Sequence, residues 1–218
     1  MKRIDLNGEY RLYTFTHSNA PECPAQLSGE SLPAVVPGNV ELDFQRAGLL
    51  PEVFFGTNAR KAKELELRDF WYVKRFSLAE LPSRAQICFD GVDTVAEYFL
   101  NGVKLGKSEN MLIGCRFPVE GVLHLGENEL AVHIFSAVAW TRSFDIQPYN
   151  VAFPGCYESL HLRKSAMNYG WDISPRLVSA GRMSIWKAER KLNFEMSTLQ
   201  PLRSMMRLRC WCFPAMRM

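Results

Sequence analysis

The sequence predicts an all-β protein built as an antiparallel β-sandwich. Three observations lead to this fold class. Short segments of alternating side chains recur along the chain, stretches rich in Gly, Pro, Asn and Asp separate them, and only one segment has helical spacing. Strands do not alternate regularly with helices, which disfavours a parallel sheet. The pattern alone does not distinguish a jelly roll from an immunoglobulin-like sandwich.

The expected elements can be placed in chain order. One short helix is predicted over residues 40–47, because Val40, Phe44 and Ala47 recur at helical spacing. Asn39 suits the N-cap of this helix and Gly48 the position after its end. Strands are expected at residues 9–15, 34–36, 70–76, 85–89, 115–119 and 130–135, and two more at 159–163 and 186–189. The proline in the strand at 115–119 places it near a sheet edge.

Residues 87–106 are the stretch around which the rest of the chain is expected to be organised, and they predict a β-hairpin. Both faces of residues 95–100 are largely apolar, which is typical of a strand buried between two layers. Asn101-Gly102 follows, and this dipeptide tolerates the positive φ angles of a type I′ turn. Val103 and Leu105 then resume the alternation. We therefore expect a central hairpin here.

The composition fits one folded domain and excludes several classes of function. With 218 residues and 47% hydrophobic content, the chain can bury one core. The net charge of +3 arises at residues 197–218, which carry four arginines and no acid; without them it is −1, so no nucleic-acid surface is expected. Apolar runs fall short of the ~18 residues of a membrane span, and residues 1–15 lack a signal-peptide core. No membrane partner and a cytoplasmic location are expected.

The last part of the chain differs from the rest. Past residue 190 the strand alternation ends and Met, Arg and Cys accumulate, so we expect one domain over residues 1–190 and an atypical basic, disordered tail over 191–218. The six cysteines match no zinc pattern and are expected to be reduced thiols. The histidines show no HExxH spacing, and Walker and dinucleotide-binding glycine patterns are missing, so no metal and no cofactor are expected.

The most specific candidate site lies at residues 168–176, NYGWDISPR. An exposed Trp171 can cover the apolar face of a pyranose, and the carboxylate of Asp172 beside it can accept hydrogen bonds from sugar hydroxyls. Gly170 and Pro175 would fix an irregular backbone that holds the pair outward. The alternative is that Trp171 packs in the core and Asp172 caps a turn, as most tryptophans are largely buried.

These residues carry a resemblance to a known family. Tyr-Gly-Trp-Asp followed by Ile-Ser-Pro resembles the signature of the β-mannosidases of glycoside hydrolase family 2, with departures at Ile173 and Ser174. The resemblance implies a jelly-roll, galactose-binding-domain-like sandwich. It also implies that Trp171 and Asp172 bind mannose in the subsite before the cleaved bond.

Further segments resemble the family's N-terminal sugar-binding domain in order and spacing. They include FDGVDTVAEYFLNGVKLG, the pairs Trp71-Tyr72, Asn110-Met111 and Arg116-Phe117, and the runs VPG, FFGTN and GENEL, and together they cover roughly residues 6–186. A departure appears at residues 181–187, where the family usually runs from Gly almost directly to Trp-Arg. This departure puts the closing strand in question.

Catalysis by this chain alone is not expected. A retaining glycosidase needs two carboxyl groups about 5–5.5 Å apart, and in the family both are glutamates of a downstream barrel. Asn128-Glu129 imitates the family's acid/base site but is interpreted as a turn-to-strand junction, and Asp90 and Asp93 are interpreted as polar turn residues. No catalytic residue is therefore assigned.

Three functional hypotheses remain open. The first is the N-terminal domain of a β-mannosidase-like hydrolase, truncated before its catalytic barrel, with a mannoside or another sugar as ligand and the missing barrel as partner. The second is a freestanding carbohydrate-binding module. The third is a non-catalytic interaction protein that uses the surface a barrel would cover.

Overall fold

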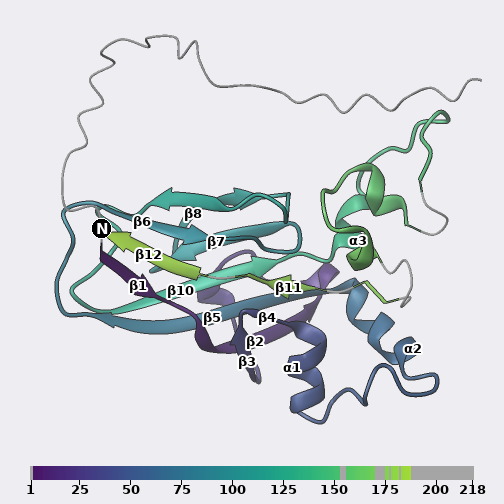
Figure 1. Ribbon diagram of the computed structural model, residues 1–218, viewed down its shortest axis with the longest axis horizontal. Helices are drawn as coiled ribbons and strands as arrows, with labels where there is room; N and C mark the ends of the chain where they lie inside the picture. Colours follow the sequence, from purple (N-terminus) through teal and green to yellow (C-terminus); the bar gives the residue numbers. More distant parts are fainter. Residues whose placement is uncertain (1, 153–155, 170–174, 177, 182, 188–218) are drawn as a thin grey trace, which may run out of the picture.

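The fold is that of a computed structural model, which describes residues 2–152, 156–169, 175–176, 178–181 and 183–187. The sequence-predicted Trp171, Asp172 and the tail at 191–218 lie outside these described residues. The described part forms two antiparallel sheets that face each other, with the three α-helices gathered at one end (Figure 1). The predicted β-sandwich is confirmed.

The larger sheet has six strands and the smaller has four. The larger follows the order β3 (Leu32–Val36), β2 (Gly8–Thr16), β5 (Arg68–Leu78), β10 (Gly126–Ile134), β7 (Ala96–Leu100) and β8 (Val103–Ser108). The smaller follows the order β1 (Lys2–Asp5), β12 (Met183–Lys187), β6 (Ala85–Phe89) and β9 (Cys115–Pro118). A short pair joins β11 (Ser179–Ala180) to β4 (Gly38–Asn39). All pairings within these sheets are antiparallel.

The core lies between the two sheets and follows the period-two pattern. In β10, the side chains of Leu130, Val132 and Ile134 are fully buried and belong to this core, as their alternation predicts. Ile87 of β6 faces them from the smaller sheet. Ala131 and Trp71 point to the outer face, where they form a second buried cluster. Both faces of the larger sheet are therefore partly covered.

The predicted hairpin exists but does not occupy the centre of the sheet. Asn101 and Gly102 both have positive φ, 50° and 80°, and connect β7 to β8 as the type I′ signature predicts. However, β8 forms the edge of the six-stranded sheet, and β5 and β10 lie in its middle. The expected central position of the hairpin was therefore wrong. Both faces of β7 are apolar because a second buried cluster, which includes Phe99, covers the outer face of the sheet.

Helix α1 (Val40–Arg46) confirms the prediction from its caps. The side chain of Asn39 accepts a hydrogen bond from the backbone N–H of Leu42 at 2.9 Å, and Gly48 has a φ of 73° after the helix ends. The expectation of only one helix was wrong. The described residues contain two further short helices, α2 (Ala59–Ala62) and α3 (Ala137–Thr141). They also contain five 3-10 turns: η1 (His17–Asn19), η2 (Pro24–Gln26), η3 (Lys63–Leu67), η4 (Tyr157–Leu160) and η5 (Ala166–Tyr169).

The N-cap of α1 yields a prediction for stability. Asn39→Ala should lower the free energy of unfolding by about 1 kcal/mol, because the Leu42 N–H loses its acceptor. Asn39→Asp keeps an acceptor oxygen and is the matched control, expected to stay close to the wild type in urea unfolding. Equal stability of Asn39→Ala and Asn39→Asp would contradict the cap's contribution.

Two expected strands need correction. The strand expected at 159–163 is wrong, because Tyr157–Leu160 forms the 3-10 turn η4 and only Arg163 makes an isolated bridge, to Asn110. The closing strand expected at 186–189 is present as β12 (Met183–Lys187), which pairs with both β1 and β6. The departure at residues 181–187 therefore leaves the closing strand intact. The described residues contain no helix long and apolar enough to cross a membrane.

Candidate functional site

A buried ion pair holds the chain just before residues 170–174. The Lys164 Nζ atom lies 3.1 Å from Asp93 Oδ1, and both side chains are at most 1% exposed. The Asn168 side chain donates a 2.6 Å hydrogen bond to the other oxygen of Asp93. Asp93 lies in the bend before β7, as its interpretation as a turn residue predicts, but it is buried and charge-paired, whereas Asp90 is exposed. Asp93 therefore ties residues 164–168 to the start of β7.

Tyr169 is the last described residue before residues 170–174, and its side chain helps to fix the backbone ahead of them. It ends the turn η5, and its hydroxyl donates a 2.7 Å hydrogen bond to the carbonyl of Leu162. The Lys164 Nζ lies 5.8 Å from the centre of the Tyr169 ring. Burial raises the pKa of Tyr169, so its hydroxyl stays a donor. The backbone that leads into residues 170–174 is thus fixed by Asp93 and by contacts within residues 162–169.

Arg176 holds the chain on the other side. Its backbone N–H donates to Glu66 Oε1 at 3.0 Å, and its Nη1 to Glu66 Oε2 at 2.9 Å. Its Nε donates to Glu158 Oε1. Burial opposes the charged form of Arg176, but the hydrogen bond and charge of Glu158 outweigh it and raise the pKa of Arg176. The Arg176 guanidinium therefore links the segment before β11 to η3 through Glu66 and to η4 through Glu158.

Val178 completes the frame through Glu41, in the first turn of α1. The Val178 N–H donates to Glu41 Oε1 at 3.1 Å, and the Val178 carbonyl accepts from the N–H of Val40 at 3.0 Å. The other carboxyl oxygen of Glu41 is buried without a hydrogen-bond partner among the described residues. Burial raises the pKa of Glu41 from 4.5 to about 7.

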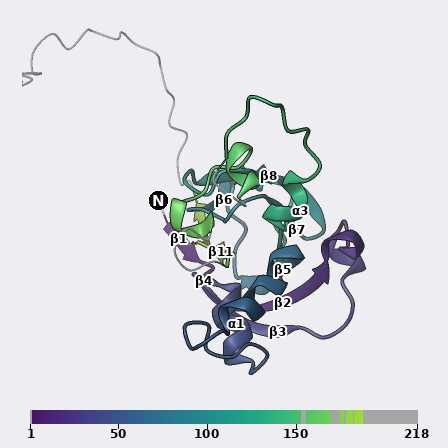
Figure 2. The ribbon, with the colours of Figure 1, turned by 90° about the vertical axis from the view of Figure 1, so that its right-hand side faces the viewer.

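A cavity of about 450 Å³ adjoins Arg176 at the helical end of the sandwich, the end that faces the viewer in Figure 2. The half-exposed aromatic rings of Phe144 and Tyr157 contribute to its wall. The other lining residues are Lys63, Glu66, Leu67, Val138, Thr141, Arg142, Ile146, Glu158 and Arg176. A cavity with aromatic walls and a few charged groups has the make-up of a small-molecule site.

The carboxylates of this frame are engaged in ion pairs. Asp93 is neutralised by Lys164, and the carboxylates of Glu66 and Glu158 share Arg176. In these pairs each carboxylate is held by a cation of the same chain, so the ion pairs fix the position of the backbone that carries them. What the described residues supply is a rigid support on both sides of residues 170–174.

The other residues considered from the sequence have structural roles. The Asn128 side chain bonds Asn101, the backbone of His124 and the carbonyl of Gly126, so it fastens the β7–β8 hairpin, and Glu129 pairs with Arg75. Asn128 and Glu129 lie inside β10, which begins at Gly126, so the expected turn-to-strand junction lies earlier in the chain, and both residues have a structural role. His133 is a buried residue of β10 whose Nε2 lies 2.9 Å from Asp69 Oδ2, while its Nδ1 has no hydrogen-bond partner among the described residues. The described cysteines, Cys23, Cys88, Cys115 and Cys156, form no disulfide bonds.

Sequence analysis missed the residues that support the site. Lys164, Glu158 and Glu66 lie in irregular or 3-10 segments, where no periodicity marks a buried side chain. Arg176 belongs to the motif at 168–176, but no role was assigned to it. A signal was available in part, because an Arg and a Lys that closely flank a candidate binding pair must meet carboxylates if they are buried.

Comparisons with known proteins show which family the chain belongs to. The sequence profile described as "Glycosyl hydrolase 2 galactose-binding domain-like" matches residues 13–187. A Beta-mannosidase B of Thermothelomyces thermophilus is 34% identical over 66% of this chain, and one of Emericella nidulans 30% over 82%. The Beta-mannosidase of Mus musculus is 30% identical over 73% of this chain. The chain spans only 18%, 21% and 19% of these relatives' lengths.

Solved structures show the same fold and the same family relationship. The crystal structure of a Beta-D-Mannosidase from Dictyoglomus thermophilum superposes with a TM-score of 0.73 at 30% identity, covering 86% of this chain and 23% of that one. An exo-chitosanase of Amycolatopsis orientalis, at 17% identity and a TM-score of 0.53, shares the fold. The chain therefore belongs to the galactose-binding domain-like family of glycosyl hydrolase 2, and its sandwich corresponds to the N-terminal domain of β-mannosidase-like enzymes.

Proposed function

We propose that this domain binds the sugar substrate of a β-mannosidase-like hydrolase, whose full-length form removes terminal β-D-mannose residues. The observation that carries the proposal is the 30% identical match to a solved Beta-D-Mannosidase over 86% of the chain. The names of the three relatives above support the same substrate class. Because the chain spans about a fifth of those relatives, the catalytic carboxylates and the barrel that bears them are assigned to the remainder of such an enzyme.

Within this function, Trp171 and Asp172 are the proposed sugar-binding residues. The indole would cover the apolar face of mannose, and the carboxylate would accept hydrogen bonds from two hydroxyls. The support for this assignment is the frame around them: Asp93 fixes Asn168 on one side, and Glu66 and Glu158 fix Arg176 on the other. Such anchoring is what a binding pair needs to be held in one orientation.

Calorimetric titration of mannose into the chain tests the proposal. We expect millimolar binding, because half a pocket buries only part of a sugar. Trp171→Ala should weaken it at least about tenfold, since loss of the ring removes both buried area and stacking worth ~1 kcal/mol or more. The chain alone should not hydrolyse an aryl β-mannoside.

The matched control is Phe54→Ala, which removes an aromatic ring that is 79% exposed and outside the frame. It should leave the affinity for mannose unchanged. Equal affinities of wild type and Trp171→Ala would overturn the assignment of Trp171. Stoichiometric, sustained hydrolysis by the chain alone would overturn the assignment of catalysis to the remainder of the enzyme.

A further inference from the structure

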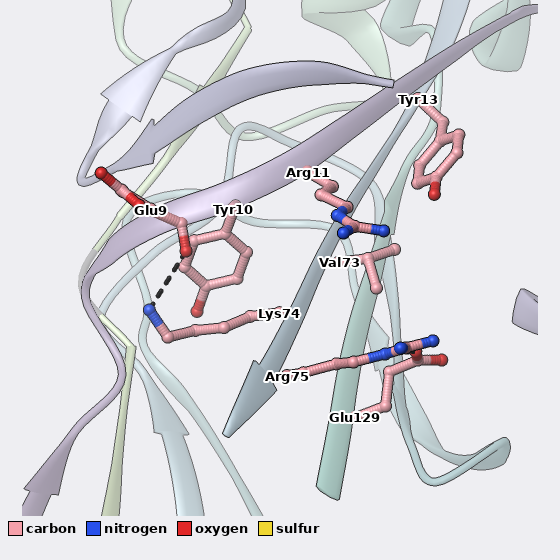
Figure 3. A pocket seen from close by; sticks show the side chains of 8 residues that line it. All are labelled: Glu9, Tyr10, Arg11, Tyr13, Val73, Lys74, Arg75 and Glu129. Atoms are coloured by element: carbon pink, nitrogen blue, oxygen red, sulfur yellow. Dashed lines mark hydrogen bonds and ion pairs between the residues drawn. The ribbon is translucent and has the colours of Figure 1, made fainter. Parts of the chain in front are cut away.

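A hollow of about 270 Å³ lies on the outer face of the six-stranded sheet, remote in sequence from the motif at 168–176. Three adjacent strands build it, so its walls are fixed by the sheet's own hydrogen bonds. The lining residues are Glu9, Tyr10, Arg11 and Tyr13 of β2, Val73, Lys74 and Arg75 of β5, and Glu129 of β10. Figure 3 shows the Arg11 and Arg75 guanidinium groups on either side of Val73, with Tyr13 beyond Arg11.

Register explains why these side chains share one face. Arg11 pairs with Val73 across β2 and β5, and Arg75 pairs with Glu129 across β5 and β10. Residues opposite each other in antiparallel strands point to the same side of the sheet. Because Leu12 points into the core, Arg11 and Tyr13 point outward.

The guanidinium of Arg11 has hydrogen-bonding capacity that the described residues leave unused. Arg11 is exposed and makes no hydrogen bond or ion pair with the described part of the chain. Arg75 uses its Nε for Glu129 Oε2 at 3.0 Å, and its side chain is 70% exposed. Two guanidinium groups beside one hollow suit a carboxylate, which accepts paired N–H donors in their fixed geometry.

Of the other charged groups, Lys74 and Glu129 are already engaged, whereas Glu9 is exposed and meets Lys74 through its backbone carbonyl. The Lys74 Nζ donates to the carbonyls of Asn7 at 2.9 Å and Glu9 at 3.1 Å, and it lies 4.9 Å from the centre of the Tyr10 ring. It therefore adds positive charge without aiming a donor into the hollow. Glu129 holds Arg75 through one oxygen. Its other oxygen can accept a hydrogen bond from a hydroxyl group.

We propose that this hollow binds a carboxylated monosaccharide, such as a uronate unit. The carboxylate lies between Arg11 and Arg75, and the ring rests on Val73 beside the phenol of Tyr13. A volume just below the ~300 Å³ at which small-molecule sites begin fits one sugar unit rather than a longer chain. The inference goes beyond the proposed function, because it places a second ligand class on a different face of the domain.

The test is an NMR titration of the isotope-labelled chain with galacturonate, with galactose and with acetate. We expect shifts confined to β2, β5 and β10 with galacturonate, at a Kd in the low millimolar range, and no saturable shifts there with galactose. Arg11→Met should weaken galacturonate binding about tenfold or more, because a carboxylate loses its unshared partner. Arg60→Met, which removes an exposed arginine of α2, is the matched control and should change nothing.

Several results would overturn the inference. Galacturonate that fails to bind, or that binds Arg11→Met as well as the wild type, would do so. Acetate that binds as tightly as galacturonate would reduce the hollow to a plain anion site and overturn its assignment to a sugar. Trp171→Ala should leave galacturonate binding unchanged, so this outcome is independent of whether Trp171 binds mannose.

Discussion

Lys164→Met is expected to lower the free energy of unfolding by about 3–5 kcal/mol. The substitution leaves the carboxylate of Asp93 in the interior with Asn168 and the Thr94 hydroxyl as hydrogen-bond partners but without a counter-charge. An uncompensated buried charge costs far more than the ion pair itself contributes. Urea unfolding, followed by tryptophan fluorescence, measures the loss.

Two further variants separate the charge from the side chain. Lys164→Met combined with Asp93→Asn removes both charges and should recover much of the stability, because no unpaired charge remains. Lys61→Met, at an exposed position of α2, should stay within about 0.5 kcal/mol of the wild type. If Lys164→Met unfolds at the wild-type urea concentration, the buried pair does not hold the chain ahead of residues 170–174.

Glu41→Gln is expected to make the protein more stable than the wild type above pH 7. Burial raises the pKa of Glu41 from 4.5 to about 7, so the folded state binds a proton more tightly than the unfolded state does. The wild type therefore loses stability as the pH rises from 4.5 to 7, and the loss is complete above pH 7. A shift of this size corresponds to about 3 kcal/mol. Glutamine avoids the loss and keeps an oxygen for the Val178 N–H.

The measurement is the difference between the unfolding free energies of Glu41→Gln and wild type from pH 4.5 to 8. The difference should increase in favour of glutamine up to about pH 7 and then level off. Glu120→Gln, at an exposed position, is the control and should change stability by less than about 0.5 kcal/mol. A difference that stays flat with pH would show that Glu41 is not the group that titrates.

Strands and caps were predictable where the signal is local. The alternation of Leu130, Val132 and Ile134 is enough to assign β10, and the Asn39 cap is enough to begin α1. What failed depends on packing. Whether β7 lies in the middle of its sheet is decided by strand order, which depends on contacts between distant segments. Residues 159–163 have strand-like side chains, but the buried carboxylate of Glu158 belongs to a turn that meets Arg176.

Of the candidate site, the sequence marks only the motif at residues 168–176. Trp171 and Asp172 stand out because an aromatic ring beside a carboxylate has a chemical meaning on its own. Lys164 and Glu66 carry no such meaning until the fold brings them to Asp93 and Arg176. Glu66 and Arg176 are 110 positions apart in the sequence, so no local pattern could have paired them.

The indole N–H resonance of Trp171 gives the most direct test of the sugar-binding role. In the labelled chain, this signal is identified by its loss in Trp171→Phe. We expect this signal to shift in a saturable manner as mannose is added, while the indole signal of the fully buried Trp71 stays in place. A Trp171 signal that does not move at mannose concentrations well above millimolar would contradict the account.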